Sequence, residues 1–194
     1  MRLKYLILLS ACAALILSCC PGQDSGLPED LCPVVVMKTT LGTMEITLDA
    51  EKAPRTVKNF LTYVNSGFYE NTIFHRAAHG IMIQGGGYTI GMQEKKTGRG
   101  VKNESENGLK NRRGAIAMAR EDKINSATSQ FFINHKDNLE FAHKDKTKNG
   151  FGYAVFGEVT SGMEIADKID STMTDTESGR IKIVVYSVKL KAKQ

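Results

Sequence analysis

The chain has 194 residues, of which 41% are hydrophobic and 24% are charged, and its formal net charge is +5. These values exclude a disordered, a collagen-like and a multi-pass membrane protein, and the length suits one ordinary domain with a tail. The four cysteines are too few for a disulfide scaffold.

The first residues have the pattern of an export signal. Arg2 and Lys4 give a basic start, and residues 5–18 then carry no charge. This uncharged run is shorter than the span of about 20 residues that a bilayer requires. We therefore predict a secretory signal peptide over residues 1–18 and not a membrane helix.

The end of this signal resembles the lipobox of bacterial lipoproteins. Ile16-Leu17-Ser18-Cys19 fits the pattern in which the cysteine thiol receives a lipid and the peptide is cut before it. Leu9-Ser10-Ala11-Cys12 also fits, but it leaves a very short apolar stretch. We expect Cys19 to be the lipid anchor, with Cys12 as the runner-up. The alternative is an ordinary secreted protein whose cysteines are incidental.

Residues 19–32 are expected to form a flexible, lipid-anchored tether. They are rich in Pro, Gly, Ser and acidic residues and have no apolar period, so they cannot bury enough surface to fold. In an exported protein Cys20 and Cys32 pair with each other or stay free, and no neighbouring Cys or His pair suggests zinc. We expect the protein in the bacterial cell envelope, on the periplasmic side of a membrane.

Residues 33–194 have the pattern of a β-rich domain. Runs of β-branched and alternating apolar residues predict strands at residues 33–39, 43–48, 72–75, 81–84, 114–119, 129–134, 153–159 and 181–190. The glycines at 85–87 are expected to break the chain. The polar, Gly-rich stretch of residues 88–113 is expected to form long loops.

Two helices interrupt the predicted strands. The first begins near Pro54, has an apolar face at i, i+3, i+4 and i+7 from Val57, and ends at Gly67. The second covers residues 161–169, with Ser161 as its N-cap. Eight strands and two helices without a βαβ rhythm predict a closed antiparallel barrel.

Most familiar kinds of chemical site are absent from the sequence. His75 and His79 lie four apart without an HExxH pattern, and the glycines at 85–87 lack the spacing of a phosphate loop. The many Lys and Arg of residues 95–123 alternate with acidic residues and have few aromatic neighbours, which favours a solvated surface over a nucleic-acid face. We expect no metal, no cofactor and no nucleic-acid partner.

One set of motifs resembles the cyclophilins, which are peptidyl-prolyl cis-trans isomerases. The motifs are Phe74-His75-Arg76, residues 80–87, Met118-Ala119-Arg120, residues 129–133, residues 152–159 and residues 162–169. The resemblance runs from about Val34 to Leu190, and residues 83–87 and 107–111 are most similar to the bacterial branch. It implies an eight-stranded barrel capped by two helices, with the active site on the outer face.

The resemblance also assigns roles that suit the reaction. A prolyl amide isomerises slowly because its C–N bond has partial double-bond character, with a barrier of about 20 kcal/mol. Catalysis requires a donor aimed at the proline nitrogen and a pocket for the ring. By resemblance Arg76 is the catalytic donor, and Gln84 holds the substrate carbonyl and orients the arginine. The alternative for Arg76 is a buried ion pair.

The resemblance further implies a peptide-binding surface around these two residues. Met82 and Phe132 are expected to pack on the proline ring, although each alone could be ordinary core. Gln130 and the backbone around Ala119 and Arg120 are expected to bind the peptide.

Three departures from the family pattern bear on function. Ile81 stands where the family usually has a phenylalanine in the pocket wall, which predicts weaker binding of the proline ring and reduced turnover. Tyr153 stands where the family has a pocket histidine, as in bacterial relatives. The chain lacks the tryptophan that many eukaryotic members use against cyclosporin, and Phe141 is our choice for the apolar rim there. We therefore expect weak cyclosporin binding.

These features predict a peptidyl-prolyl cis-trans isomerase that acts on proline-containing peptides and unfolded exported proteins. The alternative is a peptide-binding or chaperone module on the same fold with low turnover. We expect a monomer.

Overall fold

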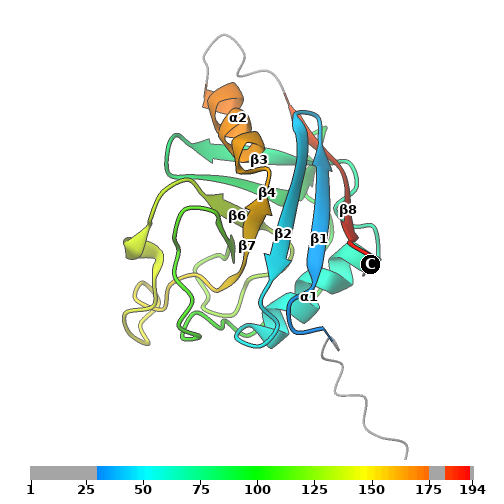
Figure 1. Ribbon diagram of the computed structural model, residues 1–194. Coiled ribbons are helices and arrows are strands. Elements are labelled where there is room, and N and C mark those ends of the chain that lie inside the picture. The colour runs from blue at the N-terminus through cyan, green and yellow to red at the C-terminus, as the bar shows by residue number, and fades with distance from the viewer. Residues whose placement is uncertain (1–29, 175–181, 193–194) are drawn as a thin grey trace, which may run out of the picture.

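Eight antiparallel strands close into a barrel in the computed structural model, which describes residues 30–174 and 182–192 (Figure 1). The strands are β1 Val34–Thr39, β2 Gly42–Leu48, β3 Thr72–Ala78, β4 Met82–Thr89, β5 Ala115–Met118, β6 Phe131–Asn134, β7 Val155–Ser161 and β8 Ile183–Leu190. They follow the order β1-β2-β7-β5-β6-β4-β3-β8, and β8 pairs with β1 to close the ring. The predicted signal peptide and nearly all of the predicted tether lie outside the described residues.

Two helices lie near opposite ends of the barrel (Figure 1). Helix α1, Pro54–Asn65, buries Val57, Phe60 and Val64 on the predicted apolar face. Gly67 follows it with a φ of +68°, and its amide donates to the Val64 carbonyl, as expected of a helix-ending glycine. Within the described residues no helix is both long and apolar enough to cross a membrane.

The predicted start of the second helix is wrong. Helix α2 covers Met163–Thr174, whereas Ser161 is the last residue of β7 and pairs with Glu45 of β2. Gly162, with a φ of +84°, makes the turn between strand and helix. Strand pairing across the barrel therefore overrides the local capping pattern.

The three glycines at 85–87 continue a strand and do not break it, contrary to the prediction. β4 runs through them to Thr89, and its register against β3 shifts at bulges. A Cβ on Gly86 would lie within 2.9 Å of the rings of Phe131 and Tyr69, and Gly86 also has a φ of +82°. Glycine is thus required where two buried rings press against the strand.

Alternating side chains divide the apolar residues between two clusters. Phe60, Tyr69, Phe131 and Phe156 belong to the main core, with Phe60 about 5 to 6 Å from each of the other three rings. Successive residues of a strand point to opposite faces, so the neighbour of Phe131 faces outward. A second, smaller cluster forms there from Met82, Ala115, Ala117, Phe132 and Val155, and we call it the outer cluster.

Candidate active site

A small pocket of about 110 Å³ opens over the outer cluster. Its lining combines two arginines, one amide and five apolar or aromatic residues: Arg76, Met82, Gln84, Ala119, Arg120, Phe132, Phe141 and Tyr153. Residues from β3, β4, β6 and two loops thus meet at one place, although they are spread over almost eighty positions of the chain. We call it the proline pocket, after the ligand that the sequence predicts for it.

A chain of side-chain hydrogen bonds crosses three segments at the edge of this pocket. Arg76 of β3 lies opposite Gln84 of β4, and Arg76 Nη1 donates to Gln84 Oε1 at 3.2 Å. Gln84 Nε2 then donates to Gln130 Oε1 at 2.9 Å. The second bond fixes which end of the Gln84 amide faces the arginine, so Gln130 orients Arg76 through Gln84.

Arg76 is exposed, and none of the ion pairs among the described residues includes it. The alternative of a buried ion pair is therefore wrong for this residue. The remaining guanidinium N–H groups have no partner within the Arg76–Gln84–Gln130 chain. A positive donor beside an apolar pocket suits the stabilisation of a lone pair that appears as an amide twists.

Three aromatic rings form the apolar side of the pocket. Phe132 meets Phe141 at 5.7 Å and Tyr153 at 5.4 Å between ring centroids, both edge to face, and Phe141 and Tyr153 are 5.4 Å apart. Edge-to-face contacts of this kind stabilise the arrangement of the three rings. Phe141, which we placed at the rim from the sequence, belongs to the short 3-10 helix η1, Leu139–Phe141, which we did not predict.

Two of the predicted binding residues do not line the pocket. Gln130 acts on it through Gln84, as described above. Ile81 is half-buried and packs against the outer cluster. The Ile81 carbonyl accepts hydrogen bonds from the His135 amide at 2.9 Å and from Asn138 Nδ2 at 3.0 Å.

A buried network of asparagines, which the sequence did not predict, lies behind Ile81. Asn111, Asn134 and Asn138 are at most 1% exposed. Asn138 Nδ2 donates to Asn134 Oδ1 at 2.7 Å, and Asn134 Nδ2 donates to Asn111 Oδ1 at 3.2 Å. The network connects the Ile81 carbonyl to the segment before β5. Three asparagines at unrelated spacings carry no local signal, so only the fold reveals them.

Neither His75 nor His79 belongs to a possible metal site among the described residues. Burial, and then the charge of neighbouring Arg76, lower the pKa of His75, whose ring packs 4.6 Å from that of Tyr88. His79 Nδ1 lies 3.1 Å from Asp170 Oδ2. Both histidines thus have structural contacts.

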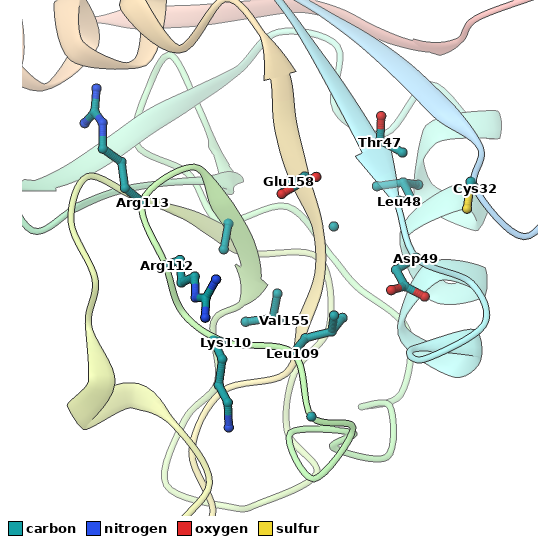
Figure 2. A pocket seen from close by; sticks show the side chains of 13 residues that line it. Cys32, Thr47, Leu48, Asp49, Leu109, Lys110, Arg112, Arg113, Val155 and Glu158 are labelled. Carbon is teal, nitrogen blue, oxygen red and sulfur yellow. The ribbon is translucent and has the colours of Figure 1, made fainter.

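A larger groove of about 460 Å³ lies on another part of the barrel surface (Figure 2). Figure 2 shows Lys110 and Arg112 on the loop at one side, and Leu48, Asp49 and Cys32 at the other. Cys32, the one cysteine among the described residues, is exposed and unpaired. None of the residues that we predicted for catalysis or substrate binding lines this groove.

Comparison with known proteins identifies the family of the chain. The model of the family "Cyclophilin type peptidyl-prolyl cis-trans isomerase/CLD" matches residues 34–190. Peptidyl-prolyl cis-trans isomerase A of Dickeya dadantii is 55% identical over 141 residues, which cover 73% of each chain. Peptidyl-prolyl cis-trans isomerase B of Escherichia coli is 50% identical over 141 residues, covering 73% of this chain and 86% of that one.

A solved structure has the same fold. A cyclophilin-type peptidyl-prolyl cis-trans isomerase of Cryptosporidium parvum, crystallised in the presence of the dipeptide Ala-Pro, matches with a TM-score of 0.66 at 29% identity. The match covers 82% of this chain and 99% of that one. The predicted closed antiparallel barrel with two helices is thereby confirmed.

Proposed function

This chain belongs to the cyclophilin-type peptidyl-prolyl cis-trans isomerases, and we propose that it acts on exported proteins with Arg76 as its catalytic residue and Gln84 as its partner. The observation that carries the residue assignment is the Arg76–Gln84 hydrogen bond of 3.2 Å at the edge of the proline pocket. No other described arginine lies next to both an orienting amide and an apolar pocket of this kind.

Rotation about the prolyl bond removes the amide resonance and leaves a lone pair on the proline nitrogen. A guanidinium N–H that donates to this lone pair stabilises the twisted amide more than the planar one, which is the requirement for catalysis. The Arg76 fork is always protonated, and Gln84 and Gln130 hold it in place before substrate arrives. Ordering the donor in advance reduces the entropy lost in the transition state.

The aromatic side of the pocket holds the ring while the bond rotates. Met82 and Phe132 are each 4% exposed, so their surfaces offer an apolar contact that water reaches poorly. Phe141 and Tyr153 close the sides. A chain without tryptophan has only these smaller rings at the rim, and we expect cyclosporin to bind weakly. A nanomolar dissociation constant in a fluorescence titration with a labelled cyclosporin contradicts this expectation.

The sequence before the barrel supports action in the cell envelope. We infer export from residues 1–18, lipid attachment at Cys19 or, as the runner-up, Cys12, and a short tether to the domain that starts at residue 33. Mass spectrometry of the mature N-terminus tests this inference. A diacylglycerol-modified cysteine supports the anchor, and an unmodified N-terminus between residues 19 and 30 rules it out.

Refolding of a secreted protein whose slow phase is limited by proline isomerisation tests the function itself. We expect catalytic amounts of the wild-type enzyme to speed that phase, and we expect Arg76→Ala to leave it slow. If both variants bind the unfolded chain and neither speeds the slow phase, the protein is a peptide-binding module with low turnover.

A further inference from the structure

Arg120 lies between the proline pocket and a second cavity. It lines both, and so does Tyr153. The second cavity has a volume of about 260 Å³, and its other walls are Glu121, Asp122, Lys148 and Asn149. A substrate whose proline occupies the first pocket places a neighbouring side chain at or near the second, because adjacent residues of an extended chain are about 3.8 Å apart.

The Arg120 side chain is fixed by neutral partners. Its Nε donates to the Gly152 carbonyl at 3.0 Å, its Nη1 to the Glu121 carbonyl at 3.0 Å and its Nη2 to the Lys148 carbonyl at 2.8 Å. The guanidinium carbon also lies 5.2 Å from the centroid of the Tyr153 ring. The Arg120 guanidinium has five N–H groups, and these bonds use three of them. One N–H on Nη1 and one on Nη2 therefore remain available to a ligand.

No carboxylate pairs with this charge among the described residues. Arg120 is absent from their ion pairs, and its three hydrogen-bond acceptors are uncharged carbonyl oxygens. The proline pocket is therefore lined by two guanidinium groups, those of Arg76 and Arg120, and by no acidic residue.

The second cavity contains charges of both signs, and these must be set against Arg120. Lys148 Nζ and Asp122 Oδ2 form an ion pair of 2.7 Å, so they largely neutralise each other. The hydrogen bond from Lys148, then the Lys148 charge and also the Arg120 charge, lower the pKa of Asp122. Glu121 is exposed and opposes Arg120. The net electrostatic field in the second cavity favours binding of a carboxylate, but the negative charges of Asp122 and Glu121 weaken that field.

We propose that Arg120 selects substrates with an aspartate or glutamate adjacent to the proline and disfavours those with a lysine or arginine there. The inference rests on the proposed function, since it names the substrate class of the same site. A charge that is already held in place recognises a carboxylate without a further loss of side-chain entropy. A charge at the rim of a binding site acts mainly on the rate at which the substrate associates and on an affinity that depends on the salt concentration.

The test compares peptides that differ at one position. Two sets of peptides carry Glu, Gln or Lys directly before or directly after a single proline, and exchange NMR gives kcat/KM without a coupling protease. For one or both sets we expect the order Glu, Gln, Lys, with about a tenfold ratio between Glu and Lys at low ionic strength. The ratio should shrink in 0.5 M salt because exposed charges are screened.

Variants separate selection from a structural role. Arg120 connects two loops, so Arg120→Gln is expected to lower turnover for every peptide. The ratio of Glu to Lys peptides is the decisive readout and should fall most of the way toward one, since Arg76 still lines the proline pocket. Asp122→Asn removes a competing carboxylate and should raise the ratio. A wild-type ratio near one in both sets, or a ratio that persists in Arg120→Gln, overturns the proposal.

The same peptides keep this proposal separate from the assignment of Arg76. If Arg76→Ala retains full turnover, the catalytic assignment fails, while the Glu to Lys ratio still reports on Arg120. If the wild type turns over none of the peptides, NMR titration gives the ratio of dissociation constants. A ratio of about one in that titration also overturns the proposal.

Discussion

Gly87 offers a way to disturb the orientation of Arg76 without substituting Arg76, Gln84 or Gln130 themselves. A Cβ at this position would lie 2.5 Å from Cγ and 2.7 Å from Cδ of Gln130, which is closer than side chains can approach. The backbone at Gly87 is not in the left-handed region, so alanine itself is tolerated. We therefore predict that Gly87→Ala displaces the Gln130 side chain.

The expected cost follows from the hydrogen bonds that Gln130 makes. Its displacement breaks the 2.9 Å bond from Gln84 Nε2 and frees the Gln84 amide, whose oxygen accepts from Arg76. A net hydrogen bond is worth about 1 to 1.5 kcal/mol, which corresponds to roughly a tenfold loss in kcat/KM. Because Gln130 is only half-buried, the free energy of unfolding should fall by less than about 1 kcal/mol.

The assay is kcat/KM on one proline peptide together with urea unfolding of each variant. Gly91→Ala is the matched control, since the nearest atom to its new Cβ is Thr89 Oγ1 at 3.8 Å, and it should leave both quantities unchanged. On a Gln130→Ala background, Gly87→Ala should cost almost nothing further. Full activity in Gly87→Ala, or a tenfold loss that persists on that background, refutes the reasoning.

Three further predictions concern the surroundings of the site. Ile81→Phe should raise kcat/KM on proline peptides, because a larger, flat ring can extend from the outer cluster into the proline pocket, which Ile81 does not line. Asn138→Ala leaves Asn134 Oδ1 without its donor in the buried network and should lower the free energy of unfolding by about 2 kcal/mol in urea titrations. Arg113 hydrogen-bonds Asp167 and lowers the pKa of that carboxyl, so Asp167 stabilises the fold above its unfolded-state pKa, and this contribution is lost as pH falls through the folded-state pKa. Asp167→Asn should therefore be less stable than wild type at pH 7, with a difference that shrinks below about pH 4.

Each of these three predictions has a result that contradicts it. Unchanged turnover in Ile81→Phe contradicts the prediction that Ile81 weakens binding of the proline ring. An Asn138→Ala variant as stable as wild type shows that the network is dispensable. A constant stability difference between Asp167→Asn and wild type from pH 7 to pH 3 shows that the Asp167 carboxyl is not stabilised by its partners.

Features with a local cause could be predicted from the sequence. Pro54 and Gly67 mark the ends of α1 because a proline fits the first turn and a glycine adopts the left-handed turn after a helix. Arg76, Gln84 and Phe132 were named through motif resemblance, and the fold brings all three to one pocket. Their roles in catalysis and binding stay predictions.

Features that depend on distant partners could not be predicted. The pairing of Ser161 with Glu45 turned an apparent helix cap into the end of a strand. Position 86 of β4 requires a glycine because the rings of Tyr69 and Phe131, which come from distant parts of the chain, leave no room for a Cβ. The buried bonds of Asn138 likewise join segments that only the closed barrel brings together.

The most direct test of the account is kcat/KM on a proline peptide for Arg76→Ala, with Arg112→Ala as a matched control. Arg112 is also exposed, but it lies at the groove on another part of the barrel and not at the proline pocket. We predict a loss of about a hundredfold or more for Arg76→Ala, with unchanged circular dichroism, and no loss for Arg112→Ala. Turnover of Arg76→Ala within a few-fold of wild type would contradict the central claim that this guanidinium stabilises the twisted prolyl amide.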